Sequence, residues 1–87
     1  MYRLVFGKKF FVSAKKLNEP LKPKLKSCLD ILSLNIFHPL LHAKPLTGKL
    51  SGFYSFRLGR DYRIIFKIIF SEEIFLIEIG DRKDIYK

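Results

Sequence analysis

Residues 53–80 read FYSFRLGRDYRIIFKIIFSEEIFLIEIG, and this stretch decides the fold. Residues 53–58 alternate strictly, which places Tyr54, Phe56 and Leu58 on one face of a strand. Two long apolar strands follow at residues 62–70 and 74–79, and each is preceded by a polar turn. The stretch therefore predicts three consecutive strands joined by short turns, a β-meander.

One strand and two helices are predicted ahead of this meander. Residues 1–6 alternate as a short strand, and residues 8–17 carry apolar side chains at helical spacing. Residues 21–34 form a second helix, in which Pro23 is tolerable only in the first turn. Residues 35–51 look irregular. The order β-α-α-β-β-β predicts an α+β fold, with the N-terminal strand and the helical hairpin packed on an antiparallel sheet.

The length and composition predict one compact, basic domain over residues 1–87. Hydrophobic residues make up 48% of the chain, which argues against disorder. The formal charge is +9, from 17 Lys and Arg against 8 Asp and Glu. Such an excess favours an anionic partner, which can be nucleic acid, an acidic protein or a membrane surface. The alternative is a basic surface that serves only solubility.

Several classes of site are poorly supported by the sequence. Cys28 is the one cysteine, which excludes an internal disulfide and fits a small core residue in a reducing cytoplasm. The spacing of His38 and His42 is not that of a zinc site, so both stay open as phosphate contacts, helix-end residues or bystanders. Cations near the N-terminus interrupt any signal-peptide pattern, and no apolar run approaches the length of a membrane span.

Cationic side chains offer a better candidate site. If the helices cover one face of the sheet, the other face carries Arg57, Arg63 and Arg82 beside aromatic residues. Cations bind phosphates and aromatic rings stack on unpaired bases, so this combination suits RNA. The alternative is that Arg57 and Arg63 are only the exposed residues of a half-buried sheet. Arg63 lies within a strongly apolar run, where an unpaired charge is costly.

Two segments resemble the RelE/ParE superfamily of toxins. Residues 44–66, KPLTGKLSGFYSFRLGRDYRIIF, are similar to the superfamily stretch K-L-x-G … G-x-Y-x-x-R-x-G-x-Y-R-x-x-Y. Residues 79–86, IGDRKDIY, are similar to the superfamily ending Gly-x-Arg-x-x-x-Tyr. The resemblance covers nearly the whole chain and implies the RelE-like microbial RNase fold.

The resemblance also implies a function: the toxin of a bacterial type II toxin–antitoxin module. The RelE branch enters the ribosomal A site and cuts mRNA, with the 2′-OH attacking the adjacent phosphate while the 5′-oxygen leaves. The toxin must activate the 2′-OH, stabilise the phosphorane and protonate the leaving oxygen, with no metal or cofactor. The implied partners are mRNA and ribosomal RNA, and an acidic, partly disordered antitoxin in a hetero-oligomer.

Catalytic roles are carried over by position. Arg57 stands where the RelE type has a lysine thought to help activate the nucleophile, and Arg63 and Arg82 match phosphate-stabilising arginines. Tyr86 matches the C-terminal aromatic that stacks on or orients the substrate. Further RNA-binding candidates are the neighbouring cations Lys49, Arg60 and Lys83.

The proton carriers are less clear, because arginine stays protonated in proteins and is a poor general base. Lys44 falls where a related branch has a catalytic histidine, and Asp61 falls on the acid of that branch. Arg82 stands where several relatives have a histidine. Two routes stay open: neighbouring cations favour a neutral, proton-accepting Lys44, or catalysis rests on charge stabilisation and on positioning by the ribosome.

Two other functions fit the same sequence. A ParE-like DNA gyrase poison has the same fold and acts by binding a protein, and the combined basic and aromatic ending argues against it. A non-catalytic RNA-binding module needs only the cations and the aromatic rings. Arrested translation with cut messages, as against DNA damage, distinguishes the first two hypotheses.

Overall fold

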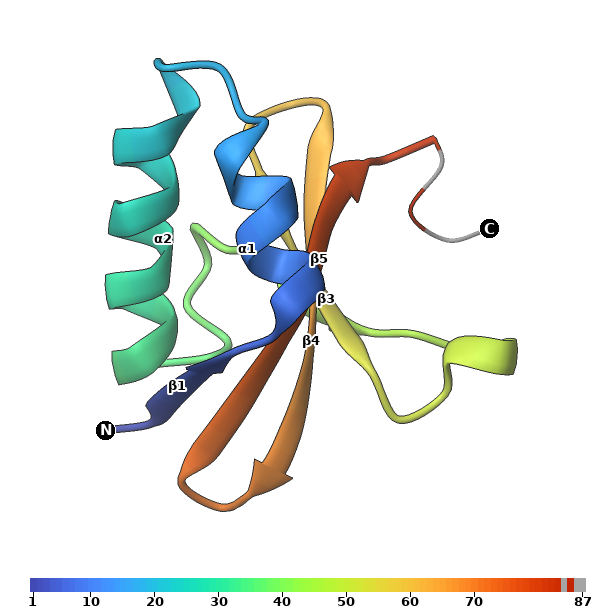
Figure 1. The fold of residues 1–87 in the computed structure, drawn as a ribbon. Helices are drawn as coiled ribbons and strands as arrows, with labels where there is room; N and C mark the ends of the chain where they lie inside the picture. Colours follow the sequence, from blue (N-terminus) through green and yellow to red (C-terminus); the bar gives the residue numbers. More distant parts are fainter. Residues whose placement is uncertain (84, 86–87) are drawn as a thin grey trace.

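The computed structural model describes residues 1–83 and 85 (Figure 1). Its elements in chain order are β1 (Arg3–Phe6), α1 (Lys8–Lys15), α2 (Leu21–Leu34), β2 (Lys44–Pro45), a 3-10 helix η1 (Gly48–Leu50), β3 (Tyr54–Leu58), β4 (Tyr62–Phe70) and β5 (Glu73–Asp81). None of the helices within the described residues combines the length and apolar composition needed to cross a bilayer.

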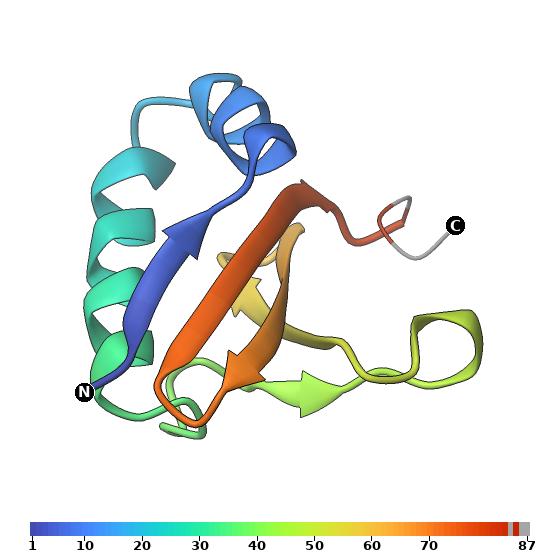
Figure 2. The same cartoon turned by 60° about the horizontal axis from the view of Figure 1, so that its bottom comes forward.

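The strands form one sheet in the order β1-β5-β4-β3-β2. The pairs β2–β3, β3–β4 and β4–β5 are antiparallel, which confirms the predicted meander and the α+β class. The first strand, β1, pairs in parallel with β5, so that Arg3 lies opposite Glu73 and Phe6 opposite Leu76. Figure 2 shows β1 and β5 side by side at one end of the sheet.

Both helices contribute to one hydrophobic core against the sheet. Phe10 and Leu17 come from the α1 region, and Leu25 and Leu32 come from α2. The sheet supplies the opposite wall, which is lined by Tyr54, Phe56, Leu58, Ile64, Phe66, Ile74, Leu76 and Ile79. The predicted inward face of residues 53–58 is therefore correct, because alternation along a strand sends every second side chain to the same layer.

The predicted helix positions hold for local chemical reasons. Pro23 is the third residue of α2, where a backbone N–H has no acceptor within the helix, so the ring costs no hydrogen bond. Gly7 precedes α1, and a Cβ at this position would lie 2.6 Å from Cε1 of Phe75. The chain therefore enters α1 by passing close against β5.

Three details of the sequence prediction are wrong. Residues 35–51 are not wholly irregular, because Lys44–Pro45 pairs with β3 and η1 follows. The last strand is longer than residues 74–79, since it begins at Glu73 and runs through Gly80, opposite Arg63, to Asp81. The sheet is also mixed, since β1 is parallel to β5. Each difference depends on hydrogen bonds between distant segments, which no local periodicity encodes.

Candidate functional site

The face of the sheet opposite the core carries a row of cations. Arg57 on β3 and Arg63 on β4 are direct register partners, and Lys44 on β2 is the partner of Ser55. Facing residues point to the same side of a sheet, as do residues i and i+2 of one strand. Lys44, Arg57 and Arg63 therefore share one face, which we call the cationic row.

The spacing within this row follows from the hydrogen-bond pattern. The backbone N–H of Arg57 donates to the carbonyl oxygen of Leu41 at 2.9 Å, away from β4. The Arg57–Arg63 pair is therefore the narrow, non-hydrogen-bonded type, with Cα atoms about 4.5 Å apart. Ser55 and Arg57 are about 7 Å apart along β3, and Lys44 lies one strand over from Ser55, so the Cα atoms of Lys44 and Arg57 are about 8 Å apart.

No ion pair among the described residues involves a member of the row, and Glu78 of β5, a carboxylate on the same face, lies opposite Ile65. Within residues 1–83 and 85, the three ion pairs join Arg3 to Glu73, Lys22 to Glu19 and Lys26 to Asp30, all away from the row. The Arg63 guanidinium donates from Nη1 to the carbonyl oxygen of Tyr62 at 2.9 Å, and this neutral partner leaves its charge in place. The row therefore attracts anions, and a planar guanidinium matches phosphate geometry.

The C-terminal tail folds back onto the same face. The backbone N–H of Arg82 donates to the Asp61 carbonyl oxygen at 2.8 Å, which ties the start of the tail to the β3–β4 turn. The N–H of Ile85 donates to the Asp81 carbonyl oxygen at 2.9 Å, and the N–H of Lys83 donates to Oδ1 of Asp81 at 2.8 Å. Arg82 and Lys83 are exposed, and both come shortly after Gly80, the β5 residue that lies opposite Arg63.

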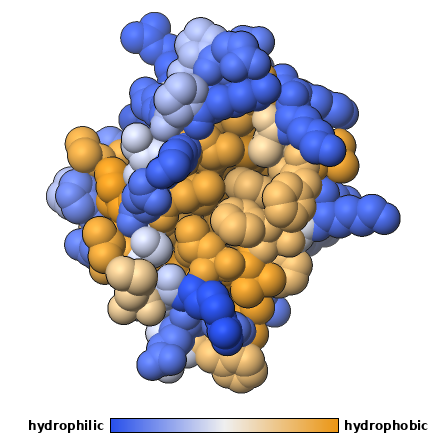
Figure 3. Space-filling view, turned by 60° about the vertical axis from the view of Figure 1, so that its left-hand side comes forward, coloured by the Kyte–Doolittle hydropathy of each residue, from blue (hydrophilic) through white to orange (hydrophobic). Residues whose placement is uncertain are grey.

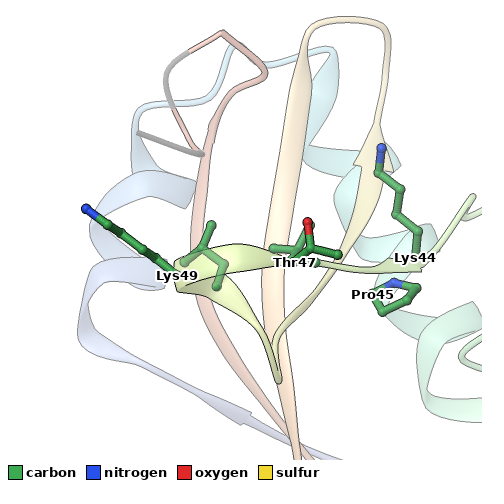
Figure 4. Close-up of a pocket in the computed structure, with 6 residues that line it drawn as sticks. Lys44, Pro45, Thr47 and Lys49 are labelled. Atoms are coloured by element: carbon green, nitrogen blue, oxygen red, sulfur yellow. The ribbon is translucent and has the colours of Figure 1, made fainter.

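The segment between β2 and β3 forms an arm beside this face. It encloses a hollow of about 440 Å³, which is lined by Lys44, Pro45, Leu46, Thr47, Lys49 and Leu50. Figure 4 shows Lys44, from β2, and Lys49, from η1, on either side of Thr47. Gly48 and Gly52 have φ angles of 67° and 95°, values that favour glycine and let the arm turn sharply.

The predicted site residues fall into two groups. Lys44, Arg57 and Arg63 lie together, and Arg82 is brought near them by the Asp61 carbonyl. Lys49 lies on the arm, while Arg60 and Asp61 are exposed in the β3–β4 turn, and Lys83 is exposed on the tail. Tyr86 lies outside the described residues.

Sequence reasoning left four neighbours out of the predicted site. Thr47 lines the hollow between two lysines, and Ser55 is buried on the cationic side at 1% exposure. Gly80 and Ile85 pack against each other next to Arg63. Of these only Ser55 carried a usable signal, since alternation puts it on the face of Arg57.

His38 lies in the turn after α2, whereas His42 lies between Leu41, whose carbonyl accepts from the Arg57 N–H, and Lys44 of the row. Nδ1 of His38 accepts a hydrogen bond from the backbone N–H of Leu40 at 3.1 Å, within the turn that follows α2. His42 is exposed and has a φ of 53°, so it turns the chain toward β2. The place of His38 just after α2 fits the helix-end interpretation, and for His42 the three interpretations stay open.

Comparisons with known proteins address the fold. No family model and no curated protein sequence matches the chain. Among solved structures, the chain is similar to YafQ from E. coli strain BL21(DE3), with 16% identity, a TM-score of 0.81 and all of both chains covered. It is also similar to the YoeB/ParE toxin from Agrobacterium tumefaciens, with 17% identity, a TM-score of 0.80 and coverage of 94% of this chain and 99% of that one.

A third similar structure comes from a complex. It is archaeal RelE with RelB from Pyrococcus horikoshii OT3, at 23% identity and a TM-score of 0.79, with coverage of 95% of this chain and 97% of that one. These likenesses extend over 94% or more of this chain. This chain therefore has the fold of the RelE/ParE-superfamily type II toxins.

Proposed function

We propose that this chain is the toxin of a type II toxin–antitoxin module and that it cuts mRNA in the ribosomal A site. The observation that carries the proposal is the cationic row, in which Lys44, Arg57 and Arg63 share one face and no described carboxylate forms an ion pair with them. The likeness in fold to YafQ, to a YoeB/ParE toxin and to RelE supports it.

The proposed reaction is an internal phosphoryl transfer. The ribose 2′-oxygen bonds to the adjacent phosphorus, the bond from phosphorus to the 5′-oxygen breaks, and a cyclic phosphate and a 5′-hydroxyl result. Arg57 and Arg63 bind the non-bridging oxygens, whose negative charge grows in the transition state. Removal of one such preorganised donor typically lowers the rate by about 10²–10³.

The proton moves through the neutral amine of Lys44 in this proposal. Arginine does not release its proton in proteins, so Lys44, in its uncharged form, is the one member of the row that can accept the proton of the 2′-OH. The same amine then returns the proton to the departing 5′-oxygen. Asp61 lies in the turn that anchors the tail, and Arg82 adds a further positive charge on that side.

The test follows cleavage and its alternative in parallel. Purified chain is added to ribosomes translating a defined mRNA, and new 5′ ends are mapped, while a gyrase supercoiling assay runs beside it. We expect cut messages and unchanged supercoiling, with about a 10²-fold lower cleavage rate for Arg63→Ala. The matched control is Lys24→Ala, which removes an exposed cation from α2.

Each contrary outcome has a defined meaning. Inhibited gyrase with intact messages refutes the nuclease and supports a gyrase poison. RNA binding without any new 5′ ends reduces the chain to a binding module. Equal loss of activity in the Lys24 and Arg63 variants would show that net charge, and not the row, governs the effect.

We further propose that the partner of this toxin is an acidic, partly disordered antitoxin with apolar anchors. Val5, Phe6, Phe11 and Val12 are large apolar residues on β1 and α1 that are 36% to 54% exposed. Figure 3 shows apolar side chains gathered on the side where β1 and α2 lie, within a border of hydrophilic ones. Residues 1–17 contain no Asp or Glu, and their cations are Arg3, Lys8, Lys9, Lys15 and Lys16.

Charge and apolar area together favour such a segment over a neutral one. RelE from Pyrococcus horikoshii was solved in a complex with RelB, which supports a protein partner for this fold. Co-expression with the product of an adjacent gene is expected to restore growth, and Phe11→Glu is expected to weaken the complex more than tenfold. Leu40→Glu is the control, since Leu40 is exposed in the loop after α2; equal weakening by both variants refutes this surface.

A further inference from the structure

The row of cations continues onto β5 at a residue without a side chain. Arg57 lies opposite Arg63, and Arg63 lies opposite Gly80. The space that a side chain would occupy at Gly80 is filled by Ile85 from the tail. A Cβ built on Gly80 would lie 2.5 Å from Cδ1, 3.2 Å from Cβ and 3.3 Å from Cγ1 of Ile85. Gly80 therefore leaves the space into which the Ile85 side chain packs, next to Arg63 and Arg57, the proposed catalytic arginines.

The tail is held by more than this contact. Ile85 is 9% exposed, and its N–H donates to the Asp81 carbonyl oxygen at 2.9 Å. The N–H of Arg82 is tied to the Asp61 carbonyl at 2.8 Å, so the tail is fixed at both ends of residues 82–85. Ile85 lies outside the main hydrophobic cluster between helices and sheet, so its burial serves the placement of the tail.

We propose that Ile85, seated on Gly80, is a positioning residue that holds the tail beside Arg63, so that Arg82 acts on the same phosphodiester as Arg57 and Arg63. This inference rests on the proposed mRNA cleavage. It adds a contact that the sequence motif does not reveal. Gly80 is required because it leaves space for a neighbouring side chain, and Ile85 is required because its side chain fills that space.

The geometry separates this role from a need for backbone flexibility. Gly80 is not among the glycines with positive φ, which are Gly48, Gly52 and Gly59, so alanine fits its backbone. Its missing Cβ points to the cationic face, because Gly80 shares the side of Arg63 and not that of the core. Gly80→Ala is therefore expected to displace Ile85 while the sheet and the core stay intact.

The experiment compares variants at both partners. Gly80→Ala, Ile85→Ala, the double variant and the conservative Ile85→Val are assayed for cleavage of ribosome-bound mRNA, with kcat and KM separated. Hydrogen exchange at the Ile85 amide reports tail docking without reference to activity, and thermal melting reports the fold. Ile69→Ala is the matched control, because Ile69 is a half-exposed isoleucine near the other end of β4.

We expect Gly80→Ala and Ile85→Ala each to lower kcat roughly tenfold with little change in KM, since small misplacements of a reacting group cost up to about 10²-fold. Exchange at residue 85 should rise in both variants. The kcat of the double variant should be no lower than that of the less active single variant, because both substitutions break the same contact. Ile85→Val should keep most of the activity, and Ile69→Ala all of it.

Three results would overturn the proposal. Faster exchange with wild-type kcat would show that the docked tail has no role in cleavage. Unchanged exchange in Gly80→Ala would show that the glycine does not seat Ile85. If the wild-type chain cuts no message, the proposed function is refuted, and the proposed role of Ile85 in cleavage is refuted with it. Hydrogen exchange at residue 85 then still decides whether the Gly80–Ile85 contact exists.

Discussion

Replacing Arg57 with glutamine is expected to stabilise the folded chain while it lowers RNA cleavage. Arg57 and Arg63 are facing partners on adjacent strands, and no described carboxylate pairs with either. Like charges directly opposite each other destabilise a sheet. Glutamine keeps much of the length of the side chain and its hydrogen-bonding ability but removes the repulsion. The free energy of unfolding therefore rises, while the affinity for phosphate falls.

The size of the gain follows from the separation. The two long side chains let the guanidinium groups spread further apart than the Cα atoms, and two unit charges about 8 Å apart in water repel by about 0.5 kcal/mol. This value lies within the range of about 0.2–1 kcal/mol for cross-strand pairs. In a domain of this length, 1 kcal/mol shifts the melting temperature by about 4–8 °C, so the expected rise is about 2–4 °C. The same substitution is expected to lower cleavage by about 10²-fold, as for any lost phosphate donor.

The assay is thermal unfolding at low salt and again at about 1 M NaCl, where the screening length falls to about 3 Å. The rise should be present at low salt and largely absent at high salt. Arg60→Gln serves as the control, because Arg60 is exposed in the β3–β4 turn and faces no cation across a strand. A fall in melting temperature at low salt, or a rise that salt does not reduce, would show that repulsion between the two arginines is not what the substitution relieves.

Three further outcomes are expected from the packing. Phe66→Ala should lower the free energy of unfolding by about 3–5 kcal/mol in urea titrations, because the ring is fully buried in the core; a loss under 1 kcal/mol would contradict its place there. Gly7→Ala should cost about 1–3 kcal/mol, because its methyl would meet the Phe75 ring at 2.6 Å, and Gly7→Ala with Phe75→Leu should recover part of that loss. Burial raises the pKa of the Cys28 thiol above 9.0, although Lys24 opposes the shift, so unfolding should expose a thiol that reacts with a disulfide reagent faster than in the folded chain. Because the unfolded thiol ionises first, its contribution to stability is present below about pH 9 and should be lost as the pH rises above that value; a flat profile there would refute the assignment.

Much of the sheet was predictable, because its information is local. Alternation at Tyr54, Phe56 and Leu58 fixes which side faces the core, and the same period assigns Arg57 to the opposite side. The placement of Arg63 beside Arg57 then follows from a tight turn, since a short connection determines how the two strands align. Two members of the cationic row were therefore predictable from sequence patterns alone.

The rest of the site was not predictable, because it depends on contacts between distant segments. Lys44 joins the row through a two-residue strand, which is too short to show any periodicity. Ile85 reaches Gly80 because the chain turns back after β5, and an isolated isoleucine in a polar tail gives no sign of its destination. The sequence also indicated that Gly80 ends the strand, whereas its lack of a side chain serves packing and not chain reversal.

The pairing of β1 with β5 has a consequence for how this protein comes into being. Arg3 faces Glu73, so β1, the first strand to be synthesised, has no neighbour in the sheet until β5, the last strand, has been made. β5 also lies between β1 and β4, and a chain interrupted before residue 73 has neither the strand that joins β1 to β4 nor the Ile85 side chain that packs on Gly80. Contacts this remote in sequence slow folding. A nascent chain that stops short of β5 therefore lacks the strand that joins β1 to the rest of the sheet.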